Sequence, residues 1–220
     1  MFVFLDSADR AQIEYWVACG VIDGVTTNPL IMVRDGVAND RDTLASLAEM
    51  IGPQRALHAA ATAVGVDELL AQAREVSGIA DNVVVKVPVV APRGEPRLAV
   101  IAELRRSGVR VNATVCLSLG QVVLAAKAGA EFVSVLVGRI DDEGGGGSGV
   151  VSAARQWIDR WGIGTKIVAA SLRSVADVQR CWDAGADCVT VAPEILGKLI
   201  DHKNARHTAR EFLDAAAQGG

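Results

Sequence analysis

Hydrophobic and polar positions alternate along the chain between two kinds of segment. Short runs are dense in valine, isoleucine, leucine and phenylalanine, and the longer stretches between them repeat apolar positions with the period of a helix. Short apolar runs rich in β-branched residues are typical of strands. We predict eight strands, at Phe2–Asp6, Gly24–Thr27, Arg55–Ala60, Asn82–Pro88, Arg110–Thr114, Glu131–Val137, Lys166–Ser171 and Asp187–Val191.

Helical patterns occupy most of the stretches between these strands. Two of the helices begin with the spacing of a capping box, at Ser118-Leu-Gly-Gln121 and Ser174-Val-Ala-Asp177. In that motif the first hydroxyl bonds a backbone N–H three residues later. Other helices are predicted at Arg10–Cys19, Asp40–Ile51, Asp67–Val76 and Leu98–Ser107, and from Glu194 to the C-terminus.

The junctions after the two capped helices are nearly identical in sequence. Ala128-Gly-Ala-Glu-Phe-Val-Ser-Val135 matches Ala184-Gly-Ala-Asp-Cys-Val-Thr-Val191, so the same helix-to-strand turn is built twice. Alternation of strand and helix favours a parallel sheet. Eight such units in a chain of 220 residues favour a closed (β/α)₈ TIM barrel.

We therefore predict one α/β domain that spans residues 1–220. A doubly wound open sheet is the alternative, although no G-x-G-x-x-G motif follows the first strand. The glycine-rich segment Gly144–Gly149 lies between two units of the same alternation. We interpret it as a mobile loop after a strand rather than a linker between domains.

The fourth predicted strand places one lysine, Lys86, among four valines. β-branched residues at this density predict a strand that is buried on both faces. A lysine is rarely buried without a partner. Burial disfavours the ammonium form, which lowers the pKa and frees the amine as a nucleophile. The alternative is a lysine at a strand end whose charged head reaches water.

Composition and charge narrow the classes of partner. The net charge is −4 and no cluster of lysine and arginine forms a basic stripe, which argues against nucleic acid. The four cysteines lack C-x-x-C spacing, which argues against a disulfide framework or a zinc site and fits a reducing cytoplasm. We expect neither a signal peptide nor a membrane span, because no apolar run has the required pattern or length. High apolar content with few aromatic residues suggests surface buried between subunits.

In a (β/α)₈ barrel the active site lies at the C-terminal ends of the strands. Lys86 there can attack a carbonyl group and form an iminium, an electron sink for breaking or making a C–C bond. Asp6 can take and return a hydroxyl proton. The rule selects Asp6, Thr26, Thr27, Asn28, Lys86, Asn112, Thr114, Arg139, Ser171 and Arg173.

The other members of this set suit binding. Thr114 can hold a water and Asn28 a substrate hydroxyl. Arg139 and Arg173 suit a phosphate group, to which Ser171 adds a hydroxyl donor.

Several of these residues also have a purely structural interpretation. Asp6 can cap the next helix. The segment Thr26-Thr-Asn-Pro29 can be only a turn. Arg139 can pair with Asp141 or Asp142 in a solvated loop. All the structural interpretations would have to hold together at one end of the barrel, which favours a functional site.

Short motifs carry a resemblance to a known family over nearly the whole chain. They are Leu5-Asp6, Gly24-Val-Thr-Thr-Asn-Pro29, Val85-Lys-Val-Pro88, Asn112-Ala-Thr114, Gln121, Val137-Gly-Arg-Ile-Asp141 and Ala169-Ala-Ser-Leu-Arg173. In these motifs the chain resembles the transaldolase family, specifically the small subfamily that includes fructose-6-phosphate aldolase. The pairing of Thr-Thr-Asn-Pro with a later Lys-Val-Pro is highly specific.

The resemblance implies a (β/α)₈ barrel that performs class I aldol chemistry without a metal or cofactor. Lys86 would form the Schiff base, Asp6 would transfer the proton and Thr114 would position the catalytic water. The implied ligand is a sugar phosphate, and the implied assembly is a homo-oligomer, a pentamer or decamer. The predicted substrate-binding residues are Thr26, Asn28, Asn112, Ser134, Arg139, Ser171 and Arg173.

Two positions depart from the family pattern. The family places Glu or Gln on the third strand to help hold the catalytic water, and this chain carries Ala60. On the sixth strand the family places Tyr or Phe, and this chain carries Leu136. His58 lies two residues before Ala60, which puts it on the same strand face and makes it a candidate substitute acid/base. A satisfied core histidine is the alternative for His58.

Two functions follow from these observations. The first is a transaldolase-like enzyme that transfers or cleaves a dihydroxyacetone unit through Lys86, including a version with altered chemistry or an unusual acceptor. The second is a non-catalytic barrel that binds a sugar phosphate, which Ala60 favours. Burying an unpaired lysine lowers the stability of the fold. A catalytic role would explain why a lysine lies there despite that cost, and this favours the enzyme.

Overall fold

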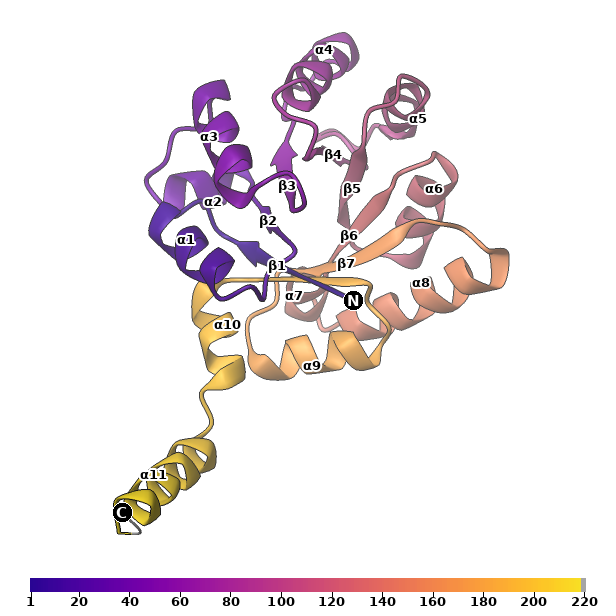
Figure 1. The fold of residues 1–220 in the computed structure, drawn as a ribbon. Coiled ribbons are helices and arrows are strands. Elements are labelled where there is room, and N and C mark those ends of the chain that lie inside the picture. Colours follow the sequence, from indigo (N-terminus) through magenta and orange to yellow (C-terminus); the bar gives the residue numbers. More distant parts are fainter. Residues whose placement is uncertain (219–220) are drawn as a thin grey trace.

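The structure is a computed structural model that describes residues 1–218. Its eight strands form one closed parallel barrel, in which β8 pairs with β1 (Figure 1). The prediction of a (β/α)₈ barrel is therefore confirmed. The strands are β1 (Phe2–Asp6), β2 (Gly24–Thr26), β3 (Ala56–Ala60), β4 (Val83–Pro88), β5 (Val111–Cys116), β6 (Phe132–Leu136), β7 (Lys166–Ala170) and β8 (Cys188–Val191).

Helices surround the barrel and connect its strands. The two capping interactions predicted from sequence are present, because Ser118 and Ser174 each accept a hydrogen bond from the N–H three residues later. The helices are α1 (Arg10–Ala18), α2 (Pro29–Arg34), α3 (Arg41–Ile51), α4 (Val66–Ser77), α5 (Leu98–Arg106), α6 (Leu119–Lys127), α7 (Val137–Asp142), α8 (Gly147–Trp161), α9 (Val175–Asp183), α10 (Pro193–Ile200) and α11 (Lys203–Gln218).

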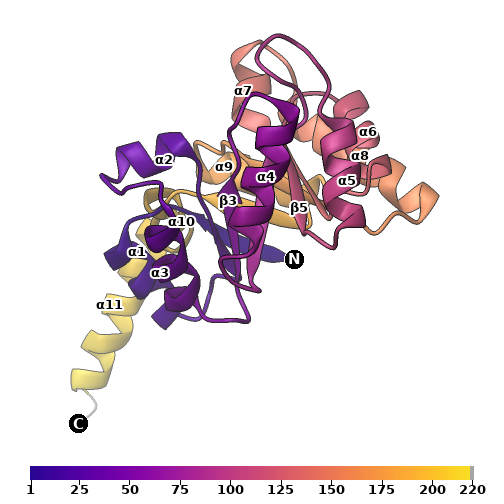
Figure 2. The same ribbon diagram turned by 90° about the horizontal axis from the view of Figure 1, so that it is seen from above.

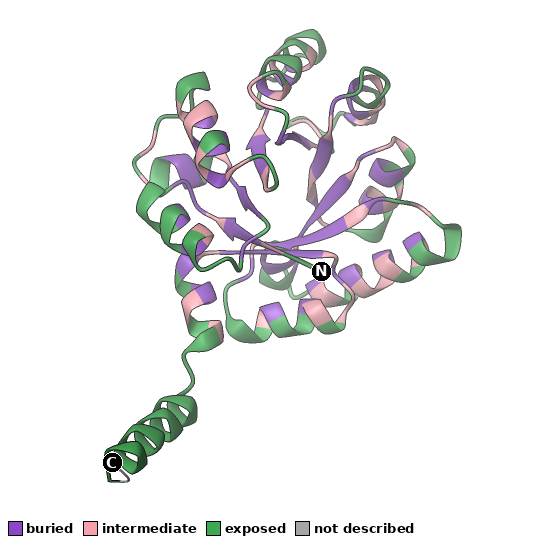
Figure 3. Ribbon diagram, viewed as in Figure 1, coloured by how far each residue is buried: buried purple, intermediate pink, exposed green. Residues whose placement is uncertain are grey.

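Burial divides the apolar residues into two cores. The larger core lies between the strands and the helices, whose outer faces remain exposed (Figure 3). A smaller core fills the barrel interior and consists of Phe4, Val84, Phe132, Val168 and Cys188. In β4, Val85 and Val87 belong to the outer core and Val84 to the inner one. The prediction of a strand buried on both faces is therefore confirmed.

The segment between β6 and β7 differs most from the sequence prediction. Val137 begins α7 instead of ending β6, and Gly147–Gly149 form the first turn of α8. The interpretation of Gly144–Gly149 as a loop was thus wrong for its second half. Glycine is a poor helix former, but Gly147 has a packing role, since an added Cβ would lie 2.6 Å from the Val137 carbonyl oxygen.

The C-terminal helical region is divided in two. Helix α10 packs against the barrel, and Asp201 and His202 separate it from α11. Helix α11 extends away from the rest of the molecule (Figures 1 and 2), and none of its residues is buried. No helix among residues 1–218 has the length and apolar character needed to cross a membrane.

Candidate active site

A cavity of about 370 Å³ opens at the C-terminal ends of the strands. Most of the residues predicted from sequence to form a site line it, and they come from strands throughout the barrel. Its polar lining consists of Asp6, Thr26, Asn28, Thr62, Lys86, Thr114, Ser134, Arg139, Ser171 and Thr190.

Lys86 lies deep in this cavity and is buried. Its Nζ donates a hydrogen bond to the Thr27 carbonyl oxygen at 2.7 Å. Among residues 1–218 no carboxylate forms an ion pair with it at 4.0 Å or less, so its hydrogen-bond acceptor is uncharged. Burial lowers the pKa of Lys86, and the charge of Asp6 opposes that shift only in part. The amine is therefore easier to deprotonate than an exposed lysine.

Asp6 ends β1 and faces the same cavity. Its Oδ1 accepts a hydrogen bond from Thr26 Oγ1 at 2.5 Å, and Thr26 Oγ1 lies 2.6 Å from Thr190 Oγ1. Since Thr26 gives its proton to Asp6, Thr190 is the donor in the second contact. Burial raises the pKa of Asp6, although Lys86 and the hydrogen bond from Thr26 act against the rise. A carboxyl group with a raised pKa is suited to taking up and returning a proton.

Backbone geometry is unusual at two positions in the wall of the cavity. Val115 has φ of 62° and Ser171 has φ of 61°, in the left-handed region that favours glycine. Val115 lies where the register between β5 and β6 shifts, directly after Thr114. Such conformations cost about 1–3 kcal/mol each and cluster at functional sites. Strain at this end of the barrel therefore agrees with the location of the cavity.

The arginine side of the cavity is built by a close contact between α7 and the end of β7. A Cβ on Gly138 would lie 2.2 Å from the Ser171 carbonyl oxygen, so only glycine allows this approach. The next residue, Arg139, reaches the cavity. Within residues 1–218 it pairs with neither nearby acid, because Asp142 binds Arg173 and Asp141 accepts from the Gly147 N–H.

Four residues predicted to join the site do not line the cavity. Thr27 is buried, and its hydroxyl donates to the His58 carbonyl oxygen at 3.2 Å. Arg173 is about half exposed and binds both carboxylate oxygens of Asp142. Asn112 and His58 are fully buried in the barrel interior. Ser134 connects this deeper level to the cavity. It lines the cavity, and its Oγ donates to Asn112 Oδ1 at 2.9 Å.

His58 occupies the level of the barrel below the cavity. Its ring lies between Phe4 and Phe132, with centroid distances of 4.9 and 4.8 Å. Nδ1 lies 2.9 Å from Asn112 Nδ2, an amide donor, so Nδ1 is the acceptor and Nε2 carries the proton. Burial holds the pKa of His58 well below its usual value. This environment fits a core histidine, but not a fully satisfied one, because the buried Nε2 has no hydrogen-bond partner within residues 1–218.

Asn28 combines two roles. Its Oδ1 caps α2 by accepting from the N–H groups of Leu30 and Ile31, at 2.9 and 3.1 Å. The same side chain lines the cavity, where its amide NH₂ group remains available. The turn interpretation and the binding interpretation of this segment are thus compatible. Asp6, in contrast, does not cap the next helix, because Asp9 does.

The two departures from the family pattern both face the cavity. Ala60 lies beside Lys86 in the register of β3 and β4, and Leu136 ends β6. The cavity wall next to the lysine is consequently apolar where the family carries an amide or carboxylate.

Thr190 is a cavity residue that the sequence analysis missed. The duplicated junction contained the signal, since Thr190 aligns with Ser134 in the two copies. Both side chains line the cavity. Arg34 was also missed. It donates from Nη2 to the Asp6 carbonyl oxygen at 3.1 Å while pairing with Asp35, and nothing in its sequence context distinguishes it from any other basic residue near a helix end.

No group of three or more His, Cys, Asp or Glu residues within the described part of the chain is arranged to hold a metal ion. The chemistry that the residues themselves can supply is an amine nucleophile, a carboxyl group for proton transfer, several hydroxyls and one arginine. These groups suit attack on a carbonyl carbon followed by proton transfer.

A sequence model and individual related proteins identify the same family for this chain. The sequence model described as Transaldolase/Fructose-6-phosphate aldolase matches residues 3–218. A probable transaldolase of Phenylobacterium zucineum is 37% identical over 221 residues, which cover 100% of this chain and 98% of that protein. A probable transaldolase of Lactiplantibacillus plantarum is 39% identical over 204 residues, covering 92% and 90%. The match to the sequence model, over residues 3–218, includes every residue that lines the cavity.

A solved structure supports the fold alone. The barrel is similar to that of a mandelate oxidase mutant carrying an FMN adduct, with a TM-score of 0.61 and 13% sequence identity. The similarity covers 87% of this chain but 63% of the oxidase chain. At this identity it concerns the (β/α)₈ architecture and not the reaction.

Proposed function

We propose that this chain, which belongs to the transaldolase/fructose-6-phosphate aldolase family, forms a Schiff base between Lys86 and the carbonyl group of a ketose phosphate. One observation carries the proposal. Lys86 is buried in the cavity with a neutral carbonyl oxygen as its hydrogen-bond partner. Burying a charged amine without a counter-charge is costly, and the cost is lower when the amine is neutral and able to attack.

The proposed reaction begins when the neutral amine of Lys86 attacks the substrate carbonyl carbon. The resulting carbinolamine loses water and becomes an iminium. Asp6 then takes the proton of the substrate's C4 hydroxyl, the C3–C4 bond breaks, and its electron pair moves into the iminium to give an enamine. An aldose phosphate leaves, and the dihydroxyacetone unit stays bound to Lys86.

The bound unit has two outcomes. Attack of the enamine on an acceptor aldehyde completes a transfer. Protonation of the enamine and hydrolysis of the iminium complete a cleavage. Thr114, which lines the cavity beside the strained Val115, is the proposed holder of the water. None of these steps calls for a cofactor.

Arg139 is the proposed phosphate-binding residue. It faces the cavity and forms no ion pair within residues 1–218, so its guanidinium group is available to an oxyanion. Ser171 is a second cavity residue with a hydroxyl donor, and Asn28, Thr26 and Ser134 form the proposed binding side for substrate hydroxyls. Asn112, predicted from sequence to bind substrate, lies below the cavity and orients Ser134 by accepting its hydroxyl proton at 2.9 Å. Arg173 can join the phosphate only after it releases Asp142.

A second candidate function is a barrel that binds a sugar phosphate without turning it over. One observation favours it, because Ala60 leaves the position beside Lys86 without a group that can hold a water. An altered aldol reaction with an unusual acceptor would have the same structural basis.

Turnover of fructose 6-phosphate, with and without erythrose 4-phosphate as acceptor, tests the proposal. Release of glyceraldehyde 3-phosphate without acceptor indicates cleavage, and release that depends on acceptor indicates transfer. Binding of fructose 6-phosphate with no product under either condition would favour the second candidate function.

We also propose that the chain assembles into a homo-oligomer, a pentamer or decamer as in the related subfamily. Helix α11 supports this, because a 16-residue helix that is exposed on all sides is marginal in water. Phe212 and Leu213 are 72% and 71% exposed on it. Light scattering should give a multimeric mass for the full chain and a smaller mass for a Phe212→Glu, Leu213→Glu double variant. A monomeric mass for the unmodified chain would contradict the proposal.

The cytoplasm is the proposed compartment. All four cysteines are free thiols, and three of them, Cys116, Cys181 and Cys188, are buried. Burial raises the pKa of the Cys116 thiol to about 12, which keeps it protonated. Unpaired thiols support a reducing compartment. Immunodetection in fractionated cells of the source organism tests this placement.

A further inference from the structure

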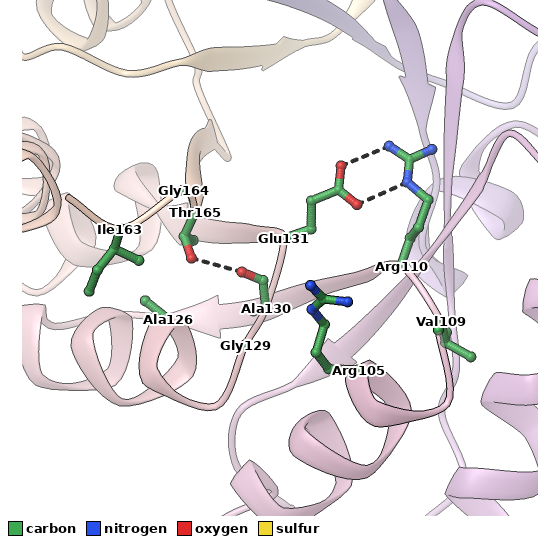
Figure 4. A pocket seen from close by; sticks show the side chains of 11 residues that line it. Arg105, Val109, Arg110, Ala126, Gly129, Ala130, Glu131, Ile163, Gly164 and Thr165 are labelled. Atoms are coloured by element: carbon green, nitrogen blue, oxygen red, sulfur yellow. Dashed lines mark hydrogen bonds and ion pairs between the residues drawn. The ribbon is translucent and has the colours of Figure 1, made fainter.

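A second cavity, of about 410 Å³, lies at the opposite end of the barrel from the candidate active site (Figure 4). It is formed where β5, β6 and β7 begin, and it shares no residue with the first cavity. Its volume is in the range of small-molecule sites. The side chains that shape it are Arg105, Val109, Arg110, Ala126, Glu131 and Ile163.

In both copies of the duplicated junction a glycine lies against an arginine of a neighbouring helix. Gly129 and Gly185 occupy the same position in the two copies, with φ of 93° and 85°. Each lies against the stem of an arginine on the neighbouring helix, Arg105 on α5 or Arg155 on α8, and not on the helix that the glycine follows. A Cβ on Gly129 would lie 2.9 Å from Arg105 Cγ, and a Cβ on Gly185 would lie 2.8 Å from Arg155 Cγ. The sequence repeat has therefore produced the same glycine–arginine packing twice.

The charges differ between the two copies. In the second, Arg155 Nη1 donates to both oxygens of Asp187, at 3.0 and 2.9 Å. In the first, the equivalent acid Glu131 is bound by another arginine, since Arg110 donates from Nε and Nη2 at 2.9 and 2.8 Å. Arg105 forms no hydrogen bond or ion pair through its side chain with any residue in 1–218. Its stem is held in place while its guanidinium has no acceptor (Figure 4).

The cavity carries a net positive charge in a protein whose overall charge is −4. Its lining holds two arginines, Arg105 and Arg110, and one acid, Glu131. Lys166 lies outside the lining, with its Nζ 3.9 Å from Glu131 Oε1. The Nη1 group of Arg110 takes no part in the two bonds to Glu131.

We propose that this cavity binds a small organic oxyanion, a phosphate monoester or a carboxylate. The guanidinium of Arg105 would bind the charged group, because its planar donors match the oxygens of such a group. Nη1 of Arg110 is the second donor. Val109, Ala126 and Ile163 form an apolar wall for a short carbon chain. The site is separate from the proposed aldol reaction and does not depend on it.

Binding of inorganic phosphate, measured by equilibrium dialysis at low ionic strength, tests the site. The background is an Arg139→Ala variant, which removes the arginine of the candidate active site and leaves the second cavity intact. We expect this variant to retain one phosphate per chain. Arg105→Gln preserves most of the stem over Gly129 and removes the charge, and it should weaken that binding at least about tenfold, as loss of a charge-assisted bond does.

The matched control is Arg106→Gln on the same helix end, where Arg106 pairs with Glu103 at 2.7 Å. It removes the same charge nearby and should change phosphate affinity by less than about twofold, the range expected for a screened surface charge. Equal weakening of phosphate binding in both variants would show that the effect comes from the overall charge and not from Arg105, and it would overturn the proposal. So would a background variant that binds no phosphate.

Two probes with the same carbon chain distinguish the sources of the oxyanion. Butyl phosphate and pentanoate, which carry the same butyl group, are used to displace the bound phosphate, and the tighter of the two identifies the charged group. If neither displaces it, the apolar wall has no part in binding and the proposed organic ligand is wrong. Thermal unfolding of each variant checks that the barrel remains folded.

Discussion

The barrel interior has two levels, and the environments of their buried polar groups are opposite. At the lower level Asn112 Nδ2 donates to His58 Nδ1 at 2.9 Å, and Asn112 Oδ1 accepts at 2.9 Å from Ser134, which lines the cavity above. His58 is packed between aromatic rings. At the upper level the ionisable groups are Lys86, which is buried, and Asp6, which is partly buried, and no ion pair of 4.0 Å or less joins them. The groups of this network are neutral and hydrogen-bonded except at His58 Nε2, which has no partner within residues 1–218, and such networks make a core rigid and specific. Buried charges without full compensation cost stability.

This difference separates residues that stabilise the barrel from residues that serve its reaction. If it is correct, loss of Lys86 or Asp6 at the upper level should strongly lower turnover and raise stability, while loss of His58 at the lower level should lower stability and spare turnover. The variants below test that division, from the largest expected effect to the smallest.

Replacement of Lys86 is expected to have the largest effect. Lys86→Met should lower turnover by a factor on the order of 10⁴, because the nucleophile is lost. The same variant should unfold at a higher temperature, since a buried amine is replaced by an apolar side chain of similar length. Turnover assays and thermal unfolding measure the two effects.

The matched control is Lys166→Met at the other end of the barrel. Lys166 is partly exposed, and its Nζ lies 5.0 Å from the centroid of the Phe132 ring. The Lys166→Met variant should have a turnover within about twofold of that of the unmodified protein, as expected for a surface change far from the reacting atoms. Lower stability after Lys86→Met would show that the lysine is structural.

Replacement of Asp6 should lower turnover by roughly 10²–10³, the contribution of a general acid–base group. Burial raises the pKa of Asp6 in the folded state, so the folded protein holds this proton more tightly than the unfolded chain. The free energy of unfolding should therefore fall as the pH rises from the pKa of the unfolded carboxyl through the raised one.

Asp6→Asn removes that part of the pH dependence and should be the more stable protein at neutral pH. Denaturant unfolding at several pH values, on both proteins, measures the difference. A pH profile that is the same in both would mean that the carboxyl group is not held in an unfavourable environment.

Replacement of His58 should affect the lower level only. His58→Ala opens a cavity between Phe4 and Phe132 and should reduce the free energy of unfolding by about 2–4 kcal/mol, as for other large-to-small core changes. Turnover per folded molecule should stay within about threefold, because the ring has no contact with the cavity. A hundredfold loss of turnover in a folded protein would instead support the role of substitute acid/base.

Restoring a polar group beside Lys86 should have the smallest effect. Ala60→Gln places an amide where it can hold a water, and we expect fructose 6-phosphate cleavage or transfer to rise by roughly 3–10-fold. Ala170→Gln is the matched control, because it adds the same amide elsewhere on the cavity wall and should give no gain. An unchanged or lower rate in the Ala60 variant would contradict the water-holding argument.

The sequence predicted the barrel and most of its upper level because both depend on local patterns. Each strand is an apolar run, and the polar residues that end the runs meet at one end of a parallel barrel. That reasoning placed Asp6, Lys86 and Thr114 correctly in the cavity.

The sequence did not predict which of several possible partners each side chain binds. Arg139 and Arg173 have similar contexts, yet Arg173 binds Asp142 and Arg139 faces the cavity. His58 and Ala60 lie on the same strand face, but their depths in the barrel differ. Helix α8 begins within a run of glycines because Gly147 packs against Val137, a contact between segments that no local pattern records.

Borohydride trapping tests the central claim, that Lys86 forms an iminium, most directly. The folded protein is reduced in the presence of dihydroxyacetone or fructose 6-phosphate and analysed by peptide mass spectrometry. We predict one reduced adduct, on the peptide that contains Lys86, and none in the Lys86→Met variant. An adduct on another lysine, or none with either donor while fructose 6-phosphate is being turned over, would contradict the claim.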